Sequence, residues 1–241
     1  MSENKELIEK EKIDRAKNGD IRLLESKDVA TIKDDSGDTL LHILASKGIV
    51  EAVEHKDAFT VVNNLNRSPL HTLAITGSLE VLNYPEAATL KDDSGYTPLH
   101  YLATTGNGKT ELFNYPNISN IKDNGGNTPL HNLMMHITEE DIDAAPKGIE
   151  NILTQTTSNS GTTLLHMLAY MRRTFIIENK KLKSKCGNTF NNVNDTPLHI
   201  LARLNVREIL NHTESDKVKN NDNETPAEIL NRLYPLQQTR E

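Results

Sequence analysis

The sequence predicts an all-α protein built from stacked helix-turn-helix repeats. A Thr-Pro-Leu-His tetrad, intact or slightly altered, recurs along the chain, a turn sequence precedes each copy, and a short apolar helix pattern follows it. The tetrad histidine falls at His42, His71, His100, His131, His166 and His199, and Glu228 occupies the same slot in a seventh copy, in steps of 29 to 35 residues. Self-similarity at such a period is typical of arrays in which each unit packs only on its neighbours.

The turn before each tetrad contains a slot that requires a positive φ angle. Glycine fills this slot in most units, and asparagine, which tolerates the left-handed region best among the other residues, fills it elsewhere. The positions are Gly37, Asn66, Gly95, Gly126, Gly161, Asn194 and Asn223. Each turn therefore predicts a tight reversal of the chain immediately before a helix.

The unit around His100 illustrates the predicted helices. Thr97 suits an N-cap and Pro98 the first helical position, where a missing N–H costs nothing. Leu99 and Leu102 then share a buried face, and Gly106 ends the helix. A short second helix should follow and stop near residues 83–85 in one unit and 114–116 in the next, because proline there forbids further helix.

These features resemble the ankyrin repeat, whose hallmark is this tetrad after an Asp-x-x-Gly turn. The match is specific at residues 97–100, 128–131 and 196–199, and it covers roughly residues 16–233. The resemblance implies an ankyrin-type solenoid with β-turn or hairpin connectors. Two departures stand out: leucine often replaces an alanine of the family pattern, and most units are shorter than the family's customary length of about 33 residues.

The expected organisation is a single solenoid over residues 1–241. Residues 1–33 form an N-terminal capping unit, 34–219 six repeats, 220–234 a C-terminal capping unit and 235–241 a frayed tail. After His131 the pattern loosens. Residues 138–154 could hold a full second helix capped by Thr138, which Pro146 and Gly148 should divide into two pieces or into a loop and a helix.

Composition limits the location and the class of the protein. The chain has 241 residues, a net charge of −7, 36% hydrophobic residues and one cysteine, Cys186. No apolar run is long enough to span a bilayer, and the amino terminus lacks the apolar core of a signal peptide. We expect a cytoplasmic protein that does not bind membranes, and a single cysteine agrees with a reducing compartment.

The nine histidines and the acidic turns do not predict a metal site or a catalytic site. Six histidines occupy one slot in successive units, so each should bond to its own N-cap and to nearby backbone. The acidic turns lack the alternating carboxylates of a calcium loop. Cys186, near two lysines, has no positioned base beside it in sequence. We therefore expect no cofactor, no metal and no enzymatic activity.

The resemblance implies a protein partner bound on the concave side of the array. The family's contact slots are the residue before the threonine and the residues after the first helix, and tyrosines there suit anchors. The candidates are Asp38, Arg67, Tyr96, Tyr101, Thr104, Asn127, Tyr170 and Asp195. The net negative charge favours a partner with a basic surface, such as a host or rival protein that this chain would inhibit.

A basic segment at residues 172–185 leaves alternatives open. It contains Arg172, Arg173, Lys180 and Lys181, and its charge of +5 contrasts with the acidic remainder. It could be a solvated loop, or it could be an insertion that binds an anion or takes part in catalysis. Nucleic acid is an unlikely partner because the rest of the surface would repel phosphate. A structural role through self-assembly is the third hypothesis, and the oligomeric state stays open.

Overall fold

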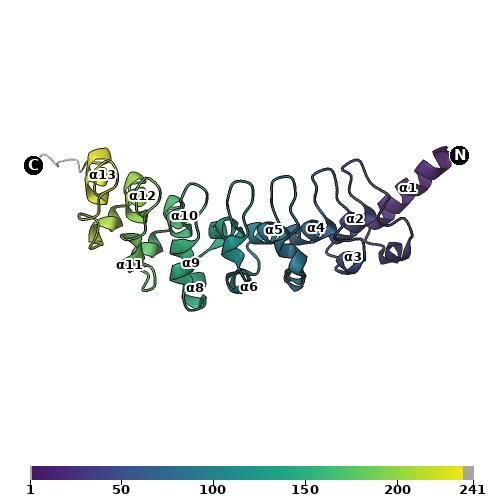
Figure 1. Cartoon of the computed structure of the whole chain (residues 1–241), viewed down its shortest axis with the longest axis horizontal. Helices are drawn as coiled ribbons and strands as arrows, with labels where there is room; N and C mark the ends of the chain where they lie inside the picture. Colours follow the sequence, from purple (N-terminus) through teal and green to yellow (C-terminus); the bar gives the residue numbers. More distant parts are fainter. Residues whose placement is uncertain (1, 236–241) are drawn as a thin grey trace, which may run out of the picture.

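The computed structural model describes residues 2–235, and these form an elongated row of short helices without a regular strand (Figure 1). The predicted all-α class is confirmed. Helix α1 (Ser2–Lys17) begins the array and α13 (Pro226–Leu233) closes it, at opposite ends of the long axis. The predicted tail lies almost wholly in residues 236–241, outside the described residues.

A first helix begins at every tetrad. These helices are α2 (Leu40–Ala45), α4 (Pro69–Ile75), α5 (Pro98–Thr105), α7 (Pro129–Leu133), α10 (Leu164–Tyr170), α12 (Pro197–Arg203) and α13. The N-cap is the predicted threonine or serine in each case, and Pro98 and its counterparts take the first helical position. Leu99 and Leu102 are fully buried, as predicted, and neighbouring first helices pack side by side along the array.

The second helices are short, and several are single 3₁₀ turns. They are η1 (Ile21–Glu25), α3 (Glu51–Glu54), η2 (Leu79–Asn83), α6 (Lys109–Asn114), η6 (Thr174–Ile177) and η7 (Arg207–Asn211). Additional turns are η3 (Pro85–Ala88), η4 (Ile118–Asn120), η5 (Met134–His136) and α11 (Lys183–Cys186). The unit after His131 carries α8 (Glu139–Ala144) and α9 (Ile149–Gln155), so the predicted division at Pro146 and Gly148 is confirmed.

We call the turn before each first helix a finger. The fingers are residues 34–38, 63–67, 92–96, 123–127, 158–162, 191–195 and 220–224, and several of them stand in a row along the upper edge of Figure 1. The glycine or asparagine slot has a positive φ in all seven, as predicted. At Gly95 a side chain would also collide with the next finger, because a Cβ would lie 2.7 Å from the backbone nitrogen of Asn124.

The expected hairpin connectors are not formed as regular strands in residues 2–235; two isolated bridges, Lys33 with Thr39 and Thr157 with Thr163, are the extent of the pairing. The two bridges occur in the units that have Leu40 and Leu164 at the first helical position; the other units have proline there, which lacks the N–H that the second bond of a bridge requires. A side chain at the first finger position also limits the pairing. In the 92–96 finger, Asp92 N–H donates to Tyr96 O at 2.9 Å, but Tyr96 N–H donates to Asp92 Oδ1 at 2.9 Å. The carboxylate therefore takes the donor that a second ladder bond would use.

No helix within the described part of the chain combines the length and the apolar character that a membrane span requires.

Candidate functional site

The tetrad histidines fasten neighbouring units together. The backbone N–H of Thr97 donates to His100 Nδ1 at 3.1 Å, so the neutral ring carries its proton on Nε2 and donates to Asn127 O of the next unit, also at 3.1 Å. Four other histidines repeat this arrangement, with Nε2 to carbonyl distances of 2.7 to 3.1 Å at His42, His71, His166 and His199. These histidines serve the architecture, as the sequence predicted.

Burial keeps the six histidines neutral. It lowers the pKa of every one of them; hydrogen bonds to backbone carbonyls oppose this in part at five, and at His131 the nearby carbonyl of Thr162 does so. The pKa falls to about 4 for His71 and for His131. Imidazoles that are buried and neutral near pH 7 suit hydrogen bonding within the protein.

The fingers carry most of the chain's excess negative charge. The seven fingers together contain nine Asp or Glu residues and one Lys or Arg, Arg67. Asp35, Asp93 and Asp222 are exposed, and none of the three forms an ion pair with a described residue. Such a row of carboxylates creates a negative potential along one edge of the array.

A second row of exposed side chains lies at the ends of the first helices, one residue after the small buried residue. Ile75 is 45% exposed, Met135 60% and Tyr170 55%, and Thr104 is exposed between Ile75 and Met135. In the next unit Arg203 fills this slot and donates to Asp195 of its own finger at 3.0 Å. The slot residues and the fingers thus belong to one surface, which we call the finger face.

Two of the predicted tyrosine anchors belong to an internal cluster of the finger face. Tyr101 OH donates to Asp92 Oδ2 at 2.6 Å, and the Arg67 guanidinium lies 4.8 Å from the Tyr101 ring centroid. Tyr96 stacks on His100 at 5.1 Å. Burial pushes the pKa of Asp92 upward, but the bonds from Tyr101, Tyr96 N–H and Arg67 outweigh it and hold that pKa below its usual value. Both tyrosines are half-buried.

The other predicted contact residues differ in accessibility. Asp38 and Asn127 are half-buried; Asp38 accepts a hydrogen bond from Asn63 at 2.7 Å. Asp195 is only 4% exposed because Arg203 and Asn220 cover its carboxylate. Tyr170 and Thr104 are open to solvent. The prediction treated these slots as equivalent, but the structure exposes some and buries others.

The basic segment is divided between two tasks and does not form one cluster. Lys181 Nζ donates to the carbonyls of Ile142, Asp143 and Ala145 at 2.8 to 3.3 Å, which caps the C-terminal end of α8. Arg173 donates to Met135 O at 3.1 Å. The segment therefore holds its unit against the preceding one.

Two cations of the segment remain exposed. Arg172 has a φ of 56° in the slot where other first helices end in glycine, and Lys180 lies beyond η6; neither forms an ion pair with a described residue. Cys186 is buried, its thiol donates to Ile176 O at 3.0 Å, and burial raises its pKa strongly. A thiol in this state is a poor nucleophile.

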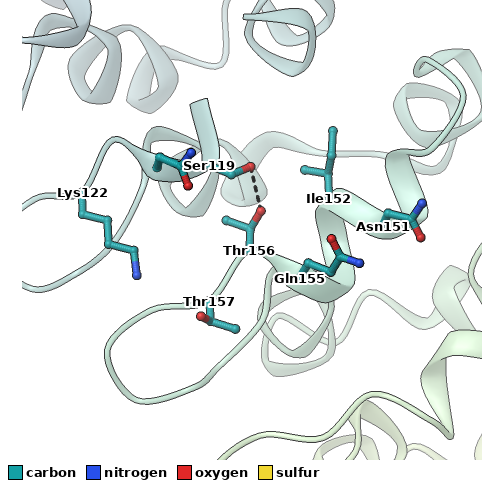
Figure 2. A pocket seen from close by; sticks show the side chains of 8 residues that line it. Ser119, Lys122, Asn151, Ile152, Gln155, Thr156 and Thr157 are labelled. Carbon is teal, nitrogen blue, oxygen red and sulfur yellow. Dashed lines mark hydrogen bonds between the residues drawn. The ribbon is translucent and has the colours of Figure 1, made fainter. Parts of the chain in front are cut away.

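Residues 2–235 contain no group of three or more His, Cys, Asp or Glu side chains arranged to hold a metal ion. A cleft of about 440 Å³ lies between η4 and α9, lined by Ser119, Lys122, Asn151, Gln155 and Thr157 among others. Figure 2 shows it at the base of two neighbouring fingers, where Thr156 Oγ1 donates to Ser119 Oγ at 2.9 Å.

The sequence prediction missed Met135, the most exposed apolar side chain of the finger face slots. In that unit Met134 replaces the small residue that marks the slot in the other units. Counting six residues from the proline at the helix start, as from Pro98 to Thr104, would have found it. Neither the known protein-family models nor the curated protein sequences contain a match to this chain.

Proposed function

We propose that this chain is an ankyrin-type solenoid that binds another protein through its finger face, and that the partner presents a basic surface. The tetrads and turns stated above support the family assignment. The observation that carries the binding role is the charge of the fingers: of their nine carboxylates, three pair with Arg67, Arg203 and Arg232, and the other six, including the exposed Asp35, Asp93 and Asp222, form no ion pair with a described residue. Unpaired carboxylates in a row raise the rate and the specificity of association with a cationic surface.

The exposed row of Ile75, Met135 and Tyr170 supports the same role. Large apolar side chains exposed at one slot of several units give a partner apolar contact area beside the carboxylates. The histidines and leucines of the motif are buried and serve packing, so the residues free to make contacts are those between the motif positions.

The test is chemical crosslinking and mass spectrometry in a lysate of the source cells, followed by binding of the purified partner. The double variant Asp35→Lys with Asp93→Lys should weaken binding at least about tenfold, with the largest loss at low salt. The matched control is Glu111→Lys with Glu208→Lys, because both glutamates are exposed on second helices and the charge change is equal. Equal loss in both variants would mean that total charge, and not the finger face, determines binding.

A further inference from the structure

The junctions between α2 and α7 are tied on the finger side by up to three kinds of bond, and the lysine bond is present at two of them. The tetrad histidine donates to a carbonyl of the next finger, as from His100 to Asn127. A lysine that lies just before one finger donates to the carbonyl just before the next finger, as Lys91 Nζ does to Lys122 O at 2.7 Å. Adjacent fingers also join through backbone, as where Asn124 N–H donates to Ser94 O at 3.1 Å.

The junction between α7 and α10 lacks all three ties among the described residues. Within the same part of the chain, the α10–α12 junction also lacks the lysine and backbone bonds, but it keeps the bond from His166 to Asp195 O at 2.9 Å. His131 is 2% exposed, yet its Nε2 makes no hydrogen bond, although the carbonyl of Thr162 faces it. Lys122 donates no hydrogen bond to residues 156–157, which lie just before the next finger, and its side chain lines the cleft. No backbone bond joins the 123–127 finger to the 158–162 finger. This step of the repeat is also the longest, at 35 residues.

Buried polar atoms without partners gather at this same junction. In residues 2–235 such side-chain atoms are His131 Nε2 and Arg173 Nε, and Arg173 reaches across the junction to Met135 O. The contact between α7 and α10 is also the smallest between neighbouring first helices. Near the base of the two fingers, one hydrogen bond between hydroxyl groups crosses the cleft, from Thr156 to Ser119 (Figure 2).

The opposite side of this junction is firmly tied. Lys181 caps the end of α8, and the buried side chain of Asn179 donates to Asp143 Oδ1 at 3.0 Å and to Glu139 Oε1 at 3.3 Å. These bonds join the second helices of the two units. The junction is therefore hydrogen-bonded on the second-helix side, whereas on the finger side Asn159 packs against Gly126 without a backbone bond.

We propose that the α7–α10 junction is a hinge, with its axis along the contacts of α8 with residues 179–181. The array up to Leu133 moves as one arm relative to α10, and the motion changes the distance between the 123–127 and 158–162 fingers. Packed interfaces hold their shape, so bending concentrates where ties are missing. The hinge would adjust the curvature of the finger face, but it does not depend on the proposed binding role.

Pulsed electron paramagnetic resonance on spin-labelled, full-length protein tests the hinge without a partner. The first pair, Ser94→Cys with Ser160→Cys, spans two junctions including the hinge. The matched control, Ser36→Cys with Ser94→Cys, spans two regular junctions at the same finger slot. Native Cys186 is buried and should stay unlabelled. The distance distribution of the first pair should be about twice as broad as that of the control, since hinge motion adds to label motion.

A third pair, Ala144→Cys with Lys180→Cys, spans the hinge on the second-helix side, where both residues are exposed. Its distribution should be as narrow as that of the control. Equal widths for the two finger pairs would overturn the hinge. A broad distribution for the third pair would also overturn it, because the whole junction would then be loose and would have no axis.

Discussion

The regular units from α2 to α7 and the looser units from α10 onward use the same tetrad but hold together differently. In the regular part, bonds that recur in every unit join finger to finger and histidine to carbonyl. At the α7–α10 junction these bonds are replaced by Lys181 and Asn179, two side chains that have no counterpart in the repeat pattern.

The difference shows that a repeated local motif does not guarantee a repeated junction. His131 keeps its N-cap bond to Thr128 at 3.0 Å but loses the bond to the next unit. The first bond depends on residues three apart, whereas the second depends on where the following unit is placed. In the unit after His131 the insertion of α8 and α9 changes that placement.

Acidification should lower the free energy of unfolding more than any substitution below. It should destabilise the regular and the looser units alike, because both contain buried histidines. Each histidine has a folded pKa below its unfolded value of 6.5, so the unfolded chain binds more protons in this window. The contribution of each histidine to the free energy of unfolding is fully present above pH 6.5 and is lost as the pH falls toward 4. The loss is about 3 kcal/mol for His71 and for His131. Circular dichroism with urea between pH 7.5 and 4.5 should show the midpoint falling, and an unchanged midpoint would contradict neutral buried histidines.

Replacing one histidine should distinguish the two regions. His100→Ala removes both the N-cap bond and the bond to Asn127, whereas His131→Ala removes the N-cap bond alone. Both changes leave a cavity, but His100→Ala should cost about 1 kcal/mol more in unfolding free energy, the usual net worth of one hydrogen bond. Urea denaturation of both variants at pH 7.5 measures this. A larger loss at His131 would mean that the two junctions are not tied as described.

The last prediction concerns the hydrogen bonds of Lys181, which replace the repeated bonds at the α7–α10 junction. Lys181→Met keeps the length of the side chain but removes three bonds to the end of α8, and should cost about 1 to 2 kcal/mol. Lys180→Met is the control, because Lys180 is exposed and should change stability by less than about 0.5 kcal/mol. Thermal denaturation monitored by circular dichroism compares them, and similar melting temperatures would show that the cap on α8 contributes little.

The repeat architecture could be read from the sequence because its signals are local. A positive φ at Asn66, an N-cap at Thr97 and a helix stop before Pro85 each follow from a few neighbouring residues. The same locality explains why most turns in residues 2–235 form no bridge, since proline at the first helical position lacks the N–H that would extend the pairing.

The candidate site was only partly predictable. Slot counting identified the finger face, including Tyr170 and Thr104, but it could not show that Arg203 covers Asp195 or that Asp92 engages Tyr101. Those contacts depend on which side chains occupy neighbouring slots of the fold.

The sequence alone determined the repeating unit, its caps and its buried leucines, because each is fixed by short-range sterics and by the apolar pattern. Only the tertiary structure decided which carboxylates stay exposed, what Lys181 and Arg173 bind, and which junction lacks its ties. These properties arise from contacts between residues 25 to 40 positions apart, and a small shift between units is enough to make or break them.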